Sequence, residues 1–169
     1  MPGWIVAYVR IVEAVGRRVG RASMYLVFVM MAVLFYSSGT KALKVPAIWT
    51  LDISEFLMVS YFLIGGAYSL QIDGHVRMDL LYGGWSPRTR THWDTFTSFF
   101  MIFYLAVLLY GCVASTIYAF EFGERAFSAW RPYMWPVKCV MTFGILIMLL
   151  QTIATFLRDL AGALGKPLP

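Results

Sequence analysis

Long uncharged stretches alternate with short charged segments along this chain of 169 residues. Three stretches hold 19, 26 and 19 consecutive uncharged residues, at 22–40, 95–120 and 139–157. A helix needs about 20 predominantly apolar residues to cross the hydrocarbon core of a bilayer. A fourth stretch, the 17 uncharged residues 56–72, becomes long enough when Glu55 lies at the interface. The pattern therefore predicts four membrane-spanning helices.

These helices define the predicted fold class, an all-α integral membrane protein with a single four-span domain over residues 1–169. All six tryptophans lie outside the apolar stretches, as expected for side chains that prefer the headgroup boundary. The predicted segments are an N-terminal helix at 1–21, spans at about 22–42, 53–72, 95–120 and 137–157, and a polar loop at 73–94.

The N-terminal segment has the pattern of an amphipathic helix. At 100° per residue, Arg10, Glu13, Arg17 and Arg21 share one face, and mainly valines share the other. This pattern predicts an interfacial helix that lies in the headgroup plane. In the alternative interpretation the segment simply extends the first span into the cytoplasm.

Composition indicates the class of protein, and the distribution of charge indicates the orientation of the chain in the membrane. With 60% hydrophobic and only 14% charged residues, the chain has too little polar surface for a soluble domain of this size. An even number of spans puts both termini and the loop 73–94 on one side, which carries nine Lys and Arg residues against five on the other. The positive-inside rule therefore predicts that both termini and this loop are cytoplasmic.

The predicted spans hold few groups capable of chemistry. Only Glu55 and Lys138 are ionisable, and both lie near span ends. Glu55 is interpreted either as a buried partner of Lys138 or a neighbouring subunit, or as a carboxylate that reaches interfacial water. Both histidines lie in the polar loop, where they cannot ligate a haem within the membrane. No thiol pair, phosphate loop or metal-ligand cluster is present in the sequence, so we expect no enzyme activity, no cofactor and no nucleic-acid partner.

Small residues within the spans are interpreted as helix-packing positions, because they let neighbouring backbones approach closely. Gly65 and Gly66 are the main pair, and the others are Gly39, Gly111, Ser115 and Gly144. Ser86 and Pro87 predict a helix start, with the serine as cap and the proline at the first helical position.

The polar loop contains a short motif with internal order. Gly74 is placed to end the second span, and His75 and Asp79, four residues apart, are neighbours on one helix face. Arg77 points away from both. The loop and its flanks, AYSLQIDGHVRMDLLYGGWSPRTRTHWD, resemble the central loop of the small membrane subunit of tripartite ATP-independent periplasmic (TRAP) transporters. The matching positions are Gly74, His75, Val76, Arg77, Met78, Asp79, Leu80, Leu81, Pro87 and Arg90.

The resemblance extends beyond the loop, to Glu55 at the start of the second span and to the Trp-Pro-Val-Lys step that ends at Lys138. It implies a four-helix scaffold in the bacterial inner membrane. In that family a large multi-span permease subunit moves an organic acid inward with sodium, and a periplasmic substrate-binding protein captures it. The small subunit supports the permease and helps to dock the binding protein. Sodium coupling is accordingly expected in the large subunit.

Within this framework the loop motif of Gly74, His75, Arg77, Asp79 and Arg90 has two interpretations. It either contacts the large subunit or lipid headgroups, or forms a local hydrogen-bond cluster that ends a helix. The third span, about 39 Å long at 1.5 Å per residue, is expected to tilt or to protrude beyond the bilayer. Protrusion, together with the outer segments 41–52 and 121–135, would offer the binding protein a contact surface.

Two rival functions are compatible with the sequence. One is a stand-alone small oligomeric transporter or channel that uses Glu55 in a shared pathway. The other is a membrane anchor subunit of a redox complex, against which the positions of the histidines argue. The sequence does not distinguish among organic-acid substrates.

Overall fold

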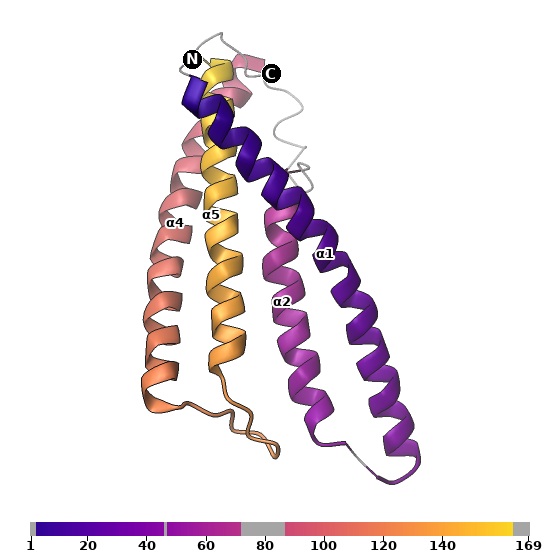
Figure 1. The fold of residues 1–169 in the computed structure, drawn as a ribbon. Coiled ribbons are helices and arrows are strands. Elements are labelled where there is room, and N and C mark those ends of the chain that lie inside the picture. Colours follow the sequence, from indigo (N-terminus) through magenta and orange to yellow (C-terminus); the bar gives the residue numbers. More distant parts are fainter. Residues whose placement is uncertain (1–2, 46, 72–86, 164–169) are drawn as a thin grey trace.

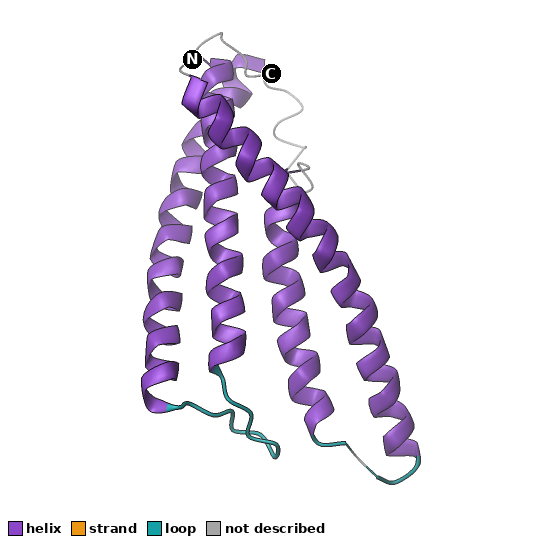
Figure 2. Cartoon of the chain, viewed as in Figure 1, coloured by secondary structure: helices purple, strands orange, loops and turns teal. Residues whose placement is uncertain are grey.

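A computed structural model describes residues 3–45, 47–71 and 87–163 of the chain. These residues form four helices: α1 Gly3–Ala42, α2 Trp49–Gln71, α4 Pro87–Phe122 and α5 Trp135–Ala163 (Figures 1 and 2). All four are long and apolar enough to cross a membrane. The predicted fold class, an all-helical chain with four membrane-spanning helices, is confirmed.

The helices pack side by side in the order α4, α5, α2, α1, and the N-terminal part of α1 also reaches α5 (Figure 1). Helix α1 begins and α5 ends at one end of the molecule, which we call the terminal end. Residues 43–45 and 47–48, which follow α1, and the connection 123–134 lie at the opposite end, the loop end (Figure 2). The central position of α5 makes it the most buried of the four spans. The other helices leave broad apolar faces uncovered by this chain.

Helix α1 runs without interruption through the amphipathic segment and the first span. The apolar face of the segment packs on α5, where Val9 and Val12 are buried against Ala154. The hydroxyl of Tyr8 also donates to the carbonyl oxygen of Leu150 at 3.2 Å. This continuity agrees with the alternative in which the segment extends the first span. Placement of the segment in the headgroup plane stays a prediction.

Close helix contacts form at some of the predicted glycines and not at others. A Cβ atom built at Gly144 would lie 2.9 Å from the Cβ atom of Leu63, and one at Gly66 would lie 3.3 Å from the sulfur of Met148, so both glycines lie where α2 meets α5. At Gly39 and Gly111 a Cβ atom would meet nothing within 4 Å. The expected packing role is therefore wrong for these two positions within this chain.

Hydroxyl groups add hydrogen bonds between helices. The hydroxyls of Thr116 in α4 and Thr142 in α5 lie 3.0 Å apart, so that one donates to the other, and each also lies within hydrogen-bonding distance of a carbonyl of its own helix. The hydroxyl of Thr50, at the start of α2, is fully buried and lies 2.9 Å from that of Ser37 in α1. Such bonds suit an apolar environment, where an unpaired hydroxyl would be costly.

Helix α4 begins at Pro87, as predicted. Its 36 residues span about 54 Å at 1.5 Å per residue, well beyond a hydrocarbon core of about 30 Å. The membrane-compatible part, Phe96–Phe122, is itself 27 residues long. A tilt of this helix, or an extension beyond the bilayer, is therefore required by its length.

Candidate functional site

The connection between α4 and α5 folds into a short hairpin, residues 123–134, which we call the loop-end hairpin. Gly123 ends α4 with a φ of 57°, a left-handed conformation common just after a helix. The amide of Ala126 then donates to the carbonyl of Pro132, and that of Met134 to the carbonyl of Glu124, both at 2.9 Å. These bonds pair the two sides of the connection, so it projects as an ordered unit.

Charged side chains fix the base of the hairpin. The ammonium of Lys138, largely buried at the start of α5, forms an ion pair with the carboxylate of Glu124. The guanidinium of Arg125 lies 4.3 Å from the centre of the Tyr133 ring and donates to its hydroxyl at 2.6 Å. The polar contact of Lys138 is thus made with the hairpin, whereas Glu55 lies exposed on α2. A role for Glu55 in contact with another subunit stays a prediction.

A hydrogen bond links the hairpin to α2, which packs between α5 and α1. The hydroxyl of Ser128 donates to a carboxylate oxygen of Asp52 at 2.9 Å and accepts from the amide of Arg131 at 3.1 Å. Asp52 is 8% exposed and lies in the first turn of α2, where the helix dipole favours a negative charge. The hairpin therefore bridges α2 and the α4–α5 pair across the loop end.

The tip of the hairpin is apolar and exposed. Phe127 is 105% exposed, more than in an extended reference peptide, and Trp130 is 43% exposed. Arg131 beside them is also exposed. Aromatic and arginine side chains are the residue types most enriched in energetically important protein contacts. The tip thus has the composition of a docking surface, on a base held by an ion pair and a hydrogen bond to α2.

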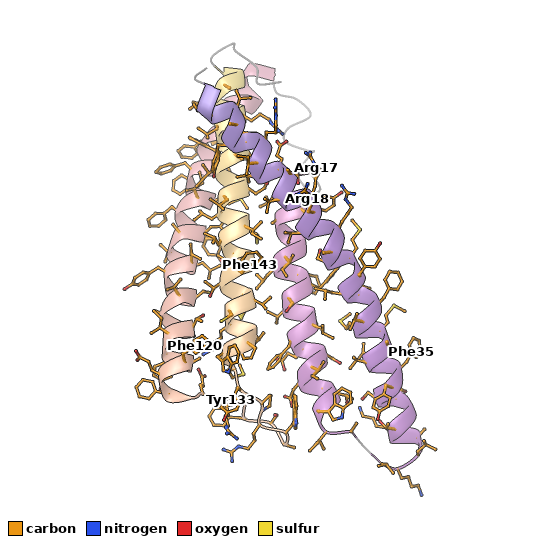
Figure 3. The ribbon with its side chains drawn as sticks, in the orientation of Figure 1. Arg17, Arg18, Phe35, Phe120, Tyr133 and Phe143 are labelled. Carbon is orange, nitrogen blue, oxygen red and sulfur yellow. The ribbon has the colours of Figure 1, made fainter. Side chains whose placement is uncertain are left out.

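Aromatic pairs mark the membrane boundary near the loop end. Tyr36 stacks on Trp49 with ring centres 5.6 Å apart, and Phe120 stacks on Trp135 at 5.1 Å. Such rings prefer the headgroup level, so they place the hairpin beyond the hydrocarbon core. Figure 3 shows Phe120 at this level and Tyr133 farther out, on the hairpin.

The terminal end has a polar junction that the sequence analysis missed. The carboxylate of Glu13 forms an ion pair with Arg158 of α5, and its backbone carbonyl accepts a hydrogen bond of 3.1 Å from the side-chain amide of Gln71. Gln151 is 2% exposed, and its side-chain oxygen and that of Gln71 both lie near Gly16. Gln151 carries no charge, so the pattern of charged residues does not reveal it, although an amide within an apolar stretch is itself a signal. The junction joins α1, α2 and α5.

Most residues of the predicted loop motif lie outside the described part of the chain. These are Gly74, His75, Arg77 and Asp79. Arg90 lies in the first turn of α4, but its side chain is outside the described set. Among the residues that the structure describes, no group of three or more His, Cys, Asp or Glu side chains could hold a metal ion. The roles predicted for the motif stay predictions.

Comparison with known proteins identifies the family. Residues 29–162 match the model of the DctQ component of tripartite ATP-independent periplasmic transporters. Neither the curated proteins nor the solved structures contain a match to this chain. The matched residues include about the last third of α1, residues 29–42, and all of α2 and α4, and they extend to within one residue of the end of α5. The resemblance found in the sequence is confirmed, and the chain belongs to the DctQ component family of tripartite ATP-independent periplasmic transporters.

Proposed function

We propose that this chain is the small scaffold subunit of its transporter. In this role it supports the large permease subunit and helps to dock a periplasmic substrate-binding protein during sodium-coupled uptake of an organic acid. The match to the DctQ family over residues 29–162 is the observation that carries the proposal. Sodium coupling and transport of the substrate belong to the large subunit.

The distribution of side chains supports a scaffold. The central parts of the spans have no charged residue, so they offer no ion path of their own. Helix α4 instead presents a row of exposed aromatic side chains, among them Phe99, Phe103 and Tyr110, which are 60–80% exposed. A membrane helix with such an exposed face requires lipid or another membrane subunit to cover it.

The charge distribution supports an orientation with both termini in the cytoplasm, as expected for a multi-pass protein of the bacterial inner membrane. Arg10, Arg17, Arg18 and Arg21 are exposed on α1 near the terminal end. In this orientation the loop-end hairpin faces the periplasm. Its aromatic tip is then on the side where a soluble binding protein would approach.

Co-purification tests the assembly. A tagged copy of the chain, expressed in its own host and extracted in mild detergent, is expected to bring down a large multi-span permease. Mass spectrometry of the eluate identifies the partner. An unrelated tagged four-span protein from the same membrane is the control. Recovery of the chain without a permease, under conditions that keep other membrane complexes intact, would contradict the proposal.

The central loop provides a second test of the same assembly. We propose that His75, Arg77 and Asp79 contact the large subunit or lipid headgroups on the cytoplasmic side. Replacing Asp79 by alanine is then expected to reduce recovery of the permease several-fold at unchanged expression. Densitometry of the two subunits in the eluate measures the ratio. Undiminished association would count against an anchoring role and favour a local hydrogen-bond cluster.

A further inference from the structure

An open groove runs between α1 and α2 in the half of the molecule nearer the terminal end. It encloses about 440 Å³, and its lining is mainly apolar. Gly20 and Met24 contribute from α1, and Tyr61, Phe62 and Gly65 contribute from α2. The groove stays open at Gly65, which carries no side chain to fill it, while the aromatic rings of Tyr61 and Phe62 form its walls. We call it the α1–α2 groove.

The groove lies at hydrocarbon depth. Met24 falls at the beginning of the first predicted span, and Gly65 falls within the second. An apolar groove open to the side at this depth faces lipid acyl chains. Its volume suits a single flexible chain.

Positive charge lies directly beside the groove. Arg17, Arg21 and Met24 follow one another at spacings of four and three residues, so they share one face of α1. With a rise of 1.5 Å per residue, Arg21 lies about 4.5 Å and Arg17 about 10 Å along the axis from Met24. Both arginines are exposed, and Figure 3 shows Arg17 on the part of α1 nearer the terminal end.

The acidic neighbour does not neutralise this charge. Glu13 lies 3.9 Å from the guanidinium of Arg17, but its closer partner is Arg158 of α5. Half of the Arg17 side chain stays exposed. Guanidinium groups bind phosphate oxygens through paired hydrogen bonds, and basic residues just outside a span attract anionic headgroups. The groove and the arginines together match the two parts of one lipid molecule.

We propose that the α1–α2 groove holds an acyl chain of a phospholipid with a net negative headgroup, and that Arg17 and Arg21 bind its phosphate. The lipid fills the space between the two helices at the level where the close contact of Gly20 with Tyr68 ends. It thereby completes the packing of α1 on α2 in the cytoplasmic leaflet. The assignment to the cytoplasmic leaflet rests on the orientation proposed above, whereas binding of the lipid does not depend on transport.

Native mass spectrometry of the full chain, co-purified with its large subunit, tests the site with phosphatidylglycerol and phosphatidylcholine as probes. The wild-type complex is expected to retain phosphatidylglycerol in preference to phosphatidylcholine. The double substitution Arg17→Gln/Arg21→Gln is expected to raise the phosphatidylglycerol concentration for half-occupancy about tenfold or more, since each juxtamembrane arginine adds several-fold to this attraction. The matched control, Arg10→Gln/Arg18→Gln, removes the same charge from the same segment and is expected to retain the lipid.

A second variant tests the groove separately from the charge. A Cβ atom at Gly65 would lie 3.8 Å from the Ser23 hydroxyl oxygen, an ordinary contact, so Gly65→Leu fills the groove without a clash at its first atom. This variant is expected to lose the retained lipid while both arginines are intact. Equal retention of the two lipids, or equal lipid affinity in the Arg17/Arg21 and Arg10/Arg18 variants, would overturn the proposal. Cross-linking of Met24→Cys to the large subunit would do so as well, because a protein would then cover the groove.

Discussion

Replacing Gly20 by alanine is expected to lower the apparent melting temperature of the purified protein by roughly 3–8 °C. A Cβ atom at this position would lie 2.5 Å from both the Cβ and the Cγ atoms of Tyr68. These atoms are close to the α2 backbone, so the two helices must separate to admit the methyl group. Overpacking of this kind typically costs about 1–3 kcal/mol, and the higher helix propensity of alanine, worth up to about 1 kcal/mol, offsets only part of that.

Gly111→Ala is the matched control, because a Cβ atom there would meet nothing within 4 Å. This variant is expected to melt at the wild-type temperature or slightly above it. Gly144→Ala is expected to fall between the two, since its Cβ atom would lie 2.9 Å from the Leu63 Cβ atom and 3.3 Å from its carbonyl carbon. Thermal melts of all three variants in one detergent give the comparison. An equal melting temperature for Gly20→Ala and Gly111→Ala would show that α1 and α2 do not meet at Gly20.

This series also shows where sequence reasoning succeeds and where it stops. The four spans could be predicted because the length of an uncharged stretch is a local property that the bilayer thickness selects directly. The partners of a glycine are not local. Gly111 and Gly144 lie in equally apolar surroundings in the sequence, and only the order in which the helices pack decides that Gly144 meets Leu63. The close contact of Gly20 could not be predicted either, because its partner Tyr68 lies on another helix. In addition, Gly20 precedes the first predicted span, where no helix packing was expected.

The N-terminal segment illustrates a second limit. A helix with valines on one face and arginines on the other has the same pattern whether its apolar face meets lipid or another helix. The valines at 9 and 12 pack on Ala154, more than 140 residues away in the sequence, a contact that periodicity cannot reveal. The partner of Lys138 was equally inaccessible, because the chain must first fold back through the loop-end hairpin to bring Glu124 to it.

The loop-end hairpin leads to the prediction with the largest effect on function. If its tip docks the periplasmic binding protein, Phe127→Asp is expected to weaken that binding at least about tenfold, since burying a phenylalanine side chain contributes about 1.5–3 kcal/mol. The introduced carboxylate would also lose its hydration in the contact, which adds to the effect. Binding of the cognate binding protein to the transporter complex in lipid nanodiscs measures the affinity. Uptake of the substrate by cells is expected to fall in parallel.

Two variants distinguish direct contact of the tip with the binding protein from an effect on the order of the hairpin. Phe127→Leu keeps an apolar tip and is expected to retain most of the affinity. Ser128→Ala removes the hydrogen bond to Asp52 but leaves Phe127 in place, so a smaller loss is expected, through a less ordered hairpin. The apparent melting temperature of the complex should not change with Phe127→Asp, because the ring touches little of its own chain at 105% exposure. Unchanged affinity of Phe127→Asp for the binding protein would contradict docking at the tip. If that variant instead lowered the thermal stability of the complex, Phe127 would be identified as a membrane anchor, since aromatic rings also hold chains at the headgroup level.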